Sequence, residues 1–253
     1  MNGTLDTLKE MLELFYNAYI RFQNFLNKNR DVIVAFLEFF SEFPELERKA
    51  GEKWIEFGWV PSLPNAMFES LYEALDAPEN QIEADRKMIS FIETQKMETL
   101  FDELRRYFID SESKPCTLNE AIACYENQLY TACVLCIYSL IDYSFLKEQP
   151  IVKGKRRPLP NNAIDKMVSE KEKNALVATY ATVGIIKELY RDGNNFTIEE
   201  KPLYRNFISH GMNDIIPQKT DCLKMFVLLY NVCLLFESDI FHSLLKKQKQ
   251  ENN

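Results

Sequence analysis

The sequence predicts an all-α protein built from an N-terminal helical region and a C-terminal helical bundle. Apolar residues recur at the spacing of amphipathic helices along most of the 253 residues. Alternating β-branched residues are scarce, and the chain has only seven glycines. Abundant Leu, Phe, Glu and Lys complete a composition that favours helices over strands.

The first two helices are predicted over 4–28 and 31–43. Pro44 can open a third helix in its first turn, and Gly58 can end it. Trp59 follows in a short proline-containing connector. There it either fills a gap between helices or is displayed by a recognition loop.

Helices over 63–75 and 79–110 come next, and the polar segment 111–115 is the best candidate for a domain boundary. Residues 1–113 carry 12 basic and 22 acidic side chains, a net charge of −10, whereas residues 114–253 carry 18 and 16, a net charge of +2. The predicted parts are therefore an acidic helical region of unknown role over 1–110, a helical bundle over 116–246 and a polar tail over 247–253.

The second part opens with Thr117 and Glu120, which fit a capping box. The helix predicted over 121–146 either runs through or restarts, and its second half is apolar almost all round, as in a core helix. Asp142 interrupts that apolar run, so its carboxylate lies at the surface or is held by a partner. Further helices are predicted over 163–170, 173–191, 203–210 and 222–245.

Charge and cysteine usage restrict the class of protein. The net charge of −8 argues against a general nucleic-acid binder, but the acidity belongs to the first part, so the second can approach a phosphate backbone. No apolar run reaches the ~20 residues of a membrane span, and no signal peptide opens the sequence, so we expect a cytoplasmic protein without membrane contact. Cys133 and Cys136 have CxxC spacing, but no second pair completes a zinc site, which predicts core residues.

The most basic cluster of the chain lies in the loop predicted over 149–162. Its cationic side chains are Lys153, Lys155, Arg156 and Arg157. Prolines and Gly154 prevent regular structure there. The cluster is either a solvated loop or a flexible phosphate clamp for a nucleic acid.

One short stretch gathers the groups that acid–base chemistry on RNA requires. Arg205, Asn206, Ser209 and His210 lie close together, and Gly211 then ends the predicted helix. A histidine can remove or return a proton near neutral pH. An arginine can hold a phosphate and its developing negative charge, and Asn206 can orient the imidazole. Cleavage of RNA by its own 2′-hydroxyl needs these roles, and neither a metal nor a cofactor.

The spacing within this stretch has a geometric consequence. On a regular helix Asn206 and His210 share one face, and Arg205 and Ser209 share a neighbouring strip. Arg205 and His210 are five residues apart and diverge by roughly 140°. That spacing suits a site built from two chains better than a site in one chain. Other chemistries have less support, because glycine-rich phosphate loops, HExxH and metal-ligand spacings do not occur in the sequence.

The pattern Arg205-Asn206-x3-His210-Gly211 resembles the Arg-x(4–6)-His signature of HEPN domains. The apolar helix over 121–146, with its acidic residue, is similar to the first core helices of that family, and the resemblance covers roughly residues 116–245. It implies an up-and-down bundle of about four or five helices that dimerises. It also implies a metal-independent endoribonuclease whose two Arg–His motifs face one RNA-binding cleft, as in toxin–antitoxin and anti-phage (abortive infection) systems.

The resemblance also implies a role for each residue. His210 would be the general acid and base, Arg205 the ligand of the phosphate, Asn206 an orienting group, and Asp142 a support for Arg205 or His210. The expected substrate contacts are Tyr204, Ser209, Lys153, Lys155, Arg156 and Arg157. The expected partners are RNA, a second copy of the chain, and an antitoxin or regulatory protein.

The alternative function is a non-catalytic helical dimer that binds a nucleotide, RNA or a protein. In that case Arg205 and His210 would be tied into internal hydrogen bonds, and no cleft would converge on them.

Overall fold

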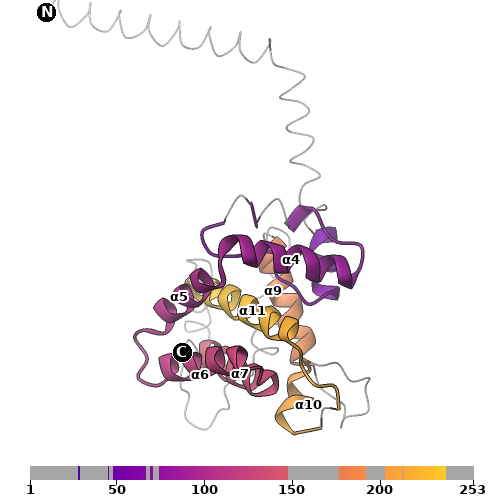
Figure 1. Ribbon diagram of the computed structural model, residues 1–253. Coiled ribbons are helices and arrows are strands. Elements are labelled where there is room, and N and C mark those ends of the chain that lie inside the picture. The colour runs from indigo at the N-terminus through magenta and orange to yellow at the C-terminus, as the bar shows by residue number, and fades with distance from the viewer. Residues whose placement is uncertain are drawn as a thin grey trace, which may run out of the picture. The chain divides into compact units, whose positions relative to one another are not determined.

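The computed structural model describes residues 28, 45, 48–66, 69–70, 74–147, 177–191, 203–212 and 214–237 (Figure 1). The chain divides into two compact units, Met1–Glu45 and Leu46–Asn253, and every described residue except 28 and 45 belongs to the second. Outside the described residues lie most of the helix predicted over 4–28, the helices predicted over 31–43 and 163–170, the basic loop and the polar tail.

The regular elements in the described part of the chain are all helices, which confirms the all-α prediction. They are α4 (Gln81–Gln95), α5 (Met97–Phe108), α6 (Lys114–Glu126), α7 (Tyr130–Lys147), α9 (Val177–Leu189), α10 (Arg205–Ser209) and α11 (Lys219–Glu237). Residues 48–56 are also helical. None of the helices described is both long enough and apolar enough to cross a membrane.

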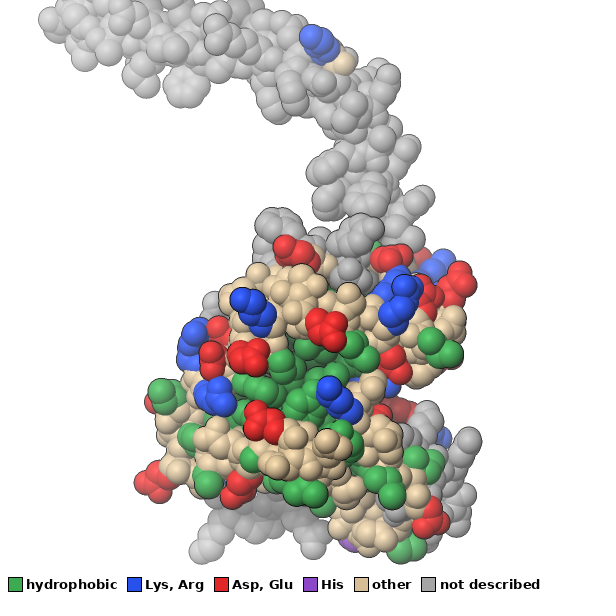
Figure 2. Space-filling view, in the orientation of Figure 1, with side chains coloured by type: hydrophobic (Ala, Val, Ile, Leu, Met, Phe, Trp, Pro, Cys, Tyr) green, Lys and Arg blue, Asp and Glu red, His purple; other side chains and the backbone are tan. Residues whose placement is uncertain are grey.

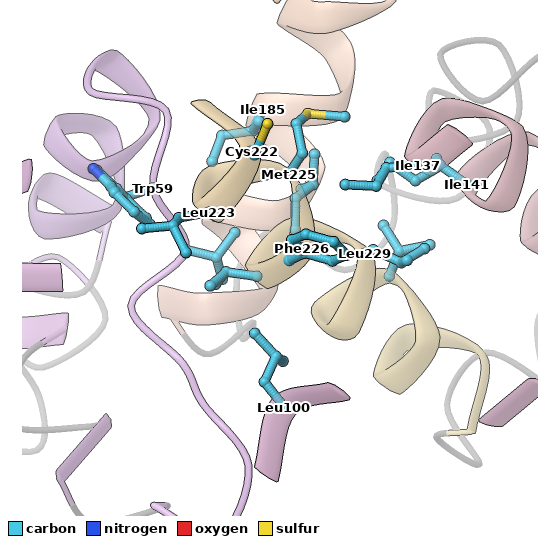
Figure 3. Close-up of a cluster of buried hydrophobic side chains, with 14 of the residues drawn as sticks. Trp59, Leu100, Ile137, Ile141, Ile185, Cys222, Leu223, Met225, Phe226 and Leu229 are labelled. Carbon is cyan, nitrogen blue, oxygen red and sulfur yellow. The ribbon is translucent and has the colours of Figure 1, made fainter. Parts of the chain in front are cut away.

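Helix α11 lies at the centre of the hydrophobic core. It contacts α5, α7 and α9. Figure 3 shows Leu100 of α5, Ile137 of α7 and Ile185 of α9 gathered around Phe226 of α11, and all four side chains are buried. Because α11 meets neighbours on several sides, it needs apolar residues around most of its circumference, as its sequence provides.

The long helix predicted over 79–110 is two helices, so that prediction is wrong in its middle. Lys96 separates α4 from α5 with a φ of 66°, a backbone conformation that a right-handed helix cannot contain. Asn80 caps the start of α4, where its side chain accepts a hydrogen bond from the Glu83 backbone N–H at 3.0 Å. No glycine or proline marks the break, and apolar spacing alone does not reveal it.

Helix α6 begins earlier than the sequence predicts. It starts at Lys114, and Pro115 lies in its first turn, where a missing backbone N–H costs no hydrogen bond. Thr117 is therefore inside the helix, with its hydroxyl donating to the Ser113 carbonyl at 3.3 Å, so the predicted capping box is wrong. The segment 111–115 joins α5 to α6 within the second unit, and the residues on both sides of it share one hydrophobic core.

The helix predicted over 121–146 restarts rather than running through. Gln128, between α6 and α7, has a φ of 61°. The backbone N–H of Gln128 donates to the Tyr125 carbonyl at 3.2 Å, and that of Leu129 donates to the Cys124 carbonyl at 2.8 Å. This pair of bonds closes the C-terminus of α6 in the manner of a Schellman motif. Helices α6 and α7 then pack against each other as a helical hairpin.

Trp59 fills a gap between helices, and the recognition-loop alternative is wrong. The side chain is fully buried. Its indole Nε1 donates to the Asp85 carboxylate of α4 at 2.7 Å, and the Lys224 ammonium of α11 lies 5.5 Å from the ring centroid. Lys224 and Asp85 also form an ion pair at 3.3 Å. A tryptophan held on both sides in this way links α4 to α11.

The CxxC pair belongs to the core, as predicted. All six cysteines are free thiols. Cys133 is buried, and a hydrogen bond with the Cys222 thiol, together with burial, raises its pKa above the ordinary range. Cys136 is half-buried beside the same core. Within the described ranges, no group of His, Cys, Asp or Glu side chains could hold a metal ion.

Replacement of Asp221, in the first turn of α11, should change how stability depends on pH. Burial raises the pKa of this carboxyl above 3.8, although the Gln218 backbone N–H and Lys224 oppose the shift. The folded chain therefore binds this proton more tightly than the unfolded chain, so the group's contribution to stability falls as pH rises from about 4 through the raised pKa. Asp221→Asn removes that loss and keeps an acceptor for the Gln218 N–H. We expect the stability of the variant relative to wild type to increase between about pH 4 and pH 6 in urea unfolding. A difference that is constant with pH would contradict this.

Candidate active site

The candidate site centres on α10, a helix of only five residues. Phe207 and Ile208 are buried and anchor it to the core. Gly211, with a φ of 64°, ends it as the sequence predicts. Its backbone N–H donates to the Ile208 carbonyl at 3.2 Å, and that of Met212 donates to the Phe207 carbonyl at 2.9 Å, which forms a second Schellman motif. Arg205 and His210 therefore lie at the two ends of this short helix, whose C-terminus is closed by the Schellman motif.

Asp142 of α7 holds Arg205 in place. The Arg205 Nη2 donates to Asp142 Oδ2 at 3.0 Å, and the Tyr190 hydroxyl donates to Asp142 Oδ1 at 2.8 Å. The guanidinium also lies 5.9 Å from the centroid of the Tyr190 ring. Of the two partners that the sequence leaves open for Asp142, the structure thus pairs it with Arg205. Because both oxygens of the Asp142 carboxylate accept hydrogen bonds, this residue links α7 to the end of α9 and to α10.

Two buried tyrosines, Tyr138 and Tyr190, lie next to the ion pair between Arg205 and Asp142. The rings of Tyr138 and Tyr190 meet edge to face, with their centroids 5.7 Å apart, and the Tyr138 hydroxyl donates to the Leu203 carbonyl. Burial raises the pKa of both hydroxyls well above 10, and the Asp142 carboxylate raises that of Tyr190 further. Both hydroxyls therefore stay protonated and remain hydrogen-bond donors at neutral pH.

Arg205 retains hydrogen-bonding capacity beyond its ion pair. A guanidinium has five N–H donors. Among the described residues the only acceptor bound to Arg205 is Asp142, and the buried Nε–H has no partner. The side chain is 24% exposed. A buried donor without an acceptor costs about 1–3 kcal/mol, and such groups are found where a protein binds a ligand or an ordered water.

A groove of about 420 Å³ lies beside Arg205. It is lined by Lys114 of α6, by Leu135, Tyr138, Ser139, Asp142, Tyr143 and Leu146 of α7, and by Arg205 and Ser209 of α10. The structure thus brings together Arg205, Ser209 and Asp142, three of the residues that the sequence proposed, at one concave surface. The volume is within the range of about 300–1,000 Å³ that is typical of small-molecule sites.

Lys114, Ser139 and Tyr143 are among the groove residues that the sequence does not single out. Lys114 belongs to a segment that the sequence predicts to be a linker, whereas Ser139 and Tyr143 belong to a helix that is predicted to be apolar almost all round. For Ser139 and Tyr143 the one signal in the sequence is their spacing. They are four residues apart on α7 and therefore lie on the same helix face as Asp142. Only the packing of α6 and α10 against that face makes them part of a site.

His210 and Asn206 lie outside the lining of this groove. His210 is exposed, directly after α10, and its backbone N–H donates to the Asn206 carbonyl at 3.2 Å. The Asn206 Nδ2 donates to the Arg191 carbonyl at 3.2 Å, so this amide ties α10 to the end of α9. His210 is therefore exposed at one end of α10, and the Arg205 guanidinium lies in the groove at the other end.

The other candidate residues are Tyr204 and the four cations of the predicted basic loop. Tyr204 is buried, its hydroxyl donates to Glu188 Oε1 at 2.6 Å, and it lines a separate hollow of about 550 Å³ between α9 and the start of α11. It does not line the groove beside Arg205. Lys153, Lys155, Arg156 and Arg157 lie outside the described residues.

Charges of both signs are interspersed on the face of the molecule that Figure 2 shows. Hydrophobic side chains gather in the middle of that face, and no broad basic area is visible among its described residues. The described residues on this face therefore present individual cations rather than a broad basic surface.

Comparisons with protein-family models, with curated proteins and with solved structures find no match to this chain.

Proposed function

We propose that this protein is a metal-independent endoribonuclease of HEPN type, which cleaves RNA through the substrate's own 2′-hydroxyl. The observation that carries the proposal is the position of Arg205 and its remaining hydrogen-bond donors. Asp142 holds the Arg205 guanidinium at the edge of a groove, where it keeps N–H donors that no described residue accepts. The exposed His210 follows at the end of the same short helix. An anchored cation and an exposed acid–base group are the two functions that phosphodiester cleavage requires, and the dimer proposed below brings them together.

In the proposed reaction the nucleophile belongs to the substrate. His210 accepts the proton of the 2′-hydroxyl as that oxygen attacks phosphorus, and the bond from phosphorus to the 5′-oxygen breaks. A proton returned by histidine neutralises the leaving 5′-oxygen. Arg205 donates hydrogen bonds to the phosphate oxygens as their negative charge increases. The products are a 2′,3′-cyclic phosphate and a free 5′-hydroxyl.

The proposal includes a two-fold dimer. Arg205 and His210 diverge by roughly 140° on a regular helix, and His210 lies outside the groove that holds Arg205. In a symmetric dimer, Arg205 of one protomer and His210 of its partner complete each site. Such an enzyme suits a toxin or phage-defence role under the control of an antitoxin or another regulatory protein.

The test is cleavage by the full-length protein in EDTA. We expect a single-stranded RNA to be cut to products with 2′,3′-cyclic phosphate ends, and a DNA of the same sequence to stay intact because it lacks the nucleophile. Failure to cut any RNA, or equal cutting of the DNA, would remove the proposed activity.

A second candidate function is a non-catalytic module that binds RNA, a nucleotide or a protein. The ion pair between Arg205 and Asp142 favours it, because an arginine that joins α7 to α10 has a structural role without any substrate. The EDTA experiment separates the two functions, since the module binds its ligand and leaves it uncut.

A further inference from the structure

We propose that the groove beside Arg205 binds one nucleotide of single-stranded RNA, with the phosphate between Lys114 and Arg205 and the base against Tyr143. This subsite rests on the proposed function for the identity of its ligand as RNA. Its additional residues, on α6 and α7, are separate from the Arg–His motif.

The first support is the charge of the groove. Its lining has two cations, Lys114 and Arg205, and one carboxylate, Asp142, so it is positive within a chain of net charge −8. Asp142 already binds Arg205. Lys114 has no carboxylate partner among the described residues, whereas Lys87 and Lys224, for example, each form ion pairs. An ammonium without a carboxylate partner is suited to bind a phosphate.

The second support is the aromatic wall. The Lys114 ammonium lies 5.0 Å from the centroid of the Tyr143 ring, and both residues line the groove. Nucleobases stack on aromatic side chains whatever their sequence, with about 1–3 kcal/mol per base. The ring and the ammonium above it can contact the two halves of a nucleotide, because the base contacts the ring and the phosphate contacts the cation. Leu135, which is 39% exposed, adds apolar surface for the base.

The third support concerns the sugar. Ser139 of α7 and Ser209 of α10 are exposed, and both line the groove, so two hydroxyls can exchange hydrogen bonds with a ribose 2′-hydroxyl. A base must also be unpaired to enter a concave site. The occupant is therefore one nucleotide of single-stranded RNA rather than a duplex or a DNA.

The experiment measures binding without cleavage. Full-length His210→Ala protein is titrated calorimetrically with a short single-stranded RNA, alone and with Lys114→Ala or Tyr143→Leu added. We expect each added substitution to weaken binding about 10-fold. Lys114→Ala should also reduce the slope of log K against log salt concentration by about 0.7, the value for one lost phosphate contact on a single strand. Tyr143→Phe should restore binding, because the ring remains.

Lys147→Ala is the matched control. Lys147 lies at the end of α7 with its ammonium 5.7 Å from the Tyr107 ring, and it is not part of the groove lining. It carries the same charge in a similar setting, so its loss should change affinity less than about 2-fold. If Lys147→Ala weakens binding as much as Lys114→Ala, or if Tyr143→Leu binds as tightly as its parent, the subsite is refuted. Equal affinity for DNA or for duplex RNA also overturns it.

The subsite and the catalytic proposal can fail separately. If wild-type protein cuts no RNA but binding still depends on Lys114 and Tyr143, the subsite stands and the nuclease does not. If RNA is cut with the same KM by wild type and by Lys114→Ala, the nuclease stands and the subsite does not.

Discussion

His210→Ala is expected to lower the rate of RNA cleavage by about 10²–10⁴-fold, the usual contribution of a general acid–base group. The side chain is exposed at the end of α10, so its loss leaves the buried contacts of Phe207 and Ile208 intact. The variant should therefore fold as wild type does, and the loss should appear in kcat more than in KM. The measurement is the initial rate of RNA cleavage in EDTA.

His242→Ala, at the only other histidine of the chain, is the control and should keep wild-type activity. A His210→Ala protein that cleaves at the wild-type rate would exclude His210 as the acid–base group.

Mixing two inactive variants tests whether each site uses two chains. Arg205→Ala and His210→Ala protomers, unfolded together and refolded, form mixed dimers in which one of the two sites has both residues. Random pairing then restores roughly a quarter of wild-type activity. A site built within one chain gives no recovery.

Phe226→Ala is expected to lower the free energy of unfolding by about 3–5 kcal/mol, the usual cost of removing a buried phenylalanine ring. Phe226 is fully buried at the centre of the core. Its ring centroid lies 5.0 Å from that of Phe101 on α5 and 5.9 Å from that of Tyr125 on α6, so the cavity forms where three helices meet. Urea unfolding followed by circular dichroism measures the change.

Leu234→Ala, two turns further along α11, is the matched control because its side chain is 38% exposed. It should cost less than about 1 kcal/mol. Equal losses for the two variants would contradict the central position of α11.

The helices themselves can be predicted from the sequence because each buries an apolar face of regular spacing. The breaks at Lys96 and Gln128 cannot, since both residues adopt a positive φ without a glycine to signal it. The start of α6 is also missed, because a polar segment that contains Pro115 is typical of a linker, although proline is equally well suited to a first helical turn.

The candidate site is predictable in part. Arg205 and His210 stand out because polar groups with complementary chemistry are close together in the chain, and Asp142 because it interrupts an apolar run. Tyr190, Lys114 and Tyr143 give no such signal. Their roles arise from the packing of α6, α7, α9 and α10, which brings together residues that are far apart in sequence.

The burial of both tryptophans supplies an optical probe of this fold. Trp54 and Trp59 are fully buried and belong to the second unit, and the chain has no other tryptophan. The Trp54 indole donates to the Ala74 carbonyl at 2.9 Å, and the Trp59 indole is bound to Asp85. An indole that leaves an apolar site for water shifts its emission to longer wavelength. Tryptophan fluorescence of the intact protein, excited at a wavelength that tyrosine does not absorb, therefore reports the opening of the unit that contains Arg205, without a label and without a contribution from residues 1–45.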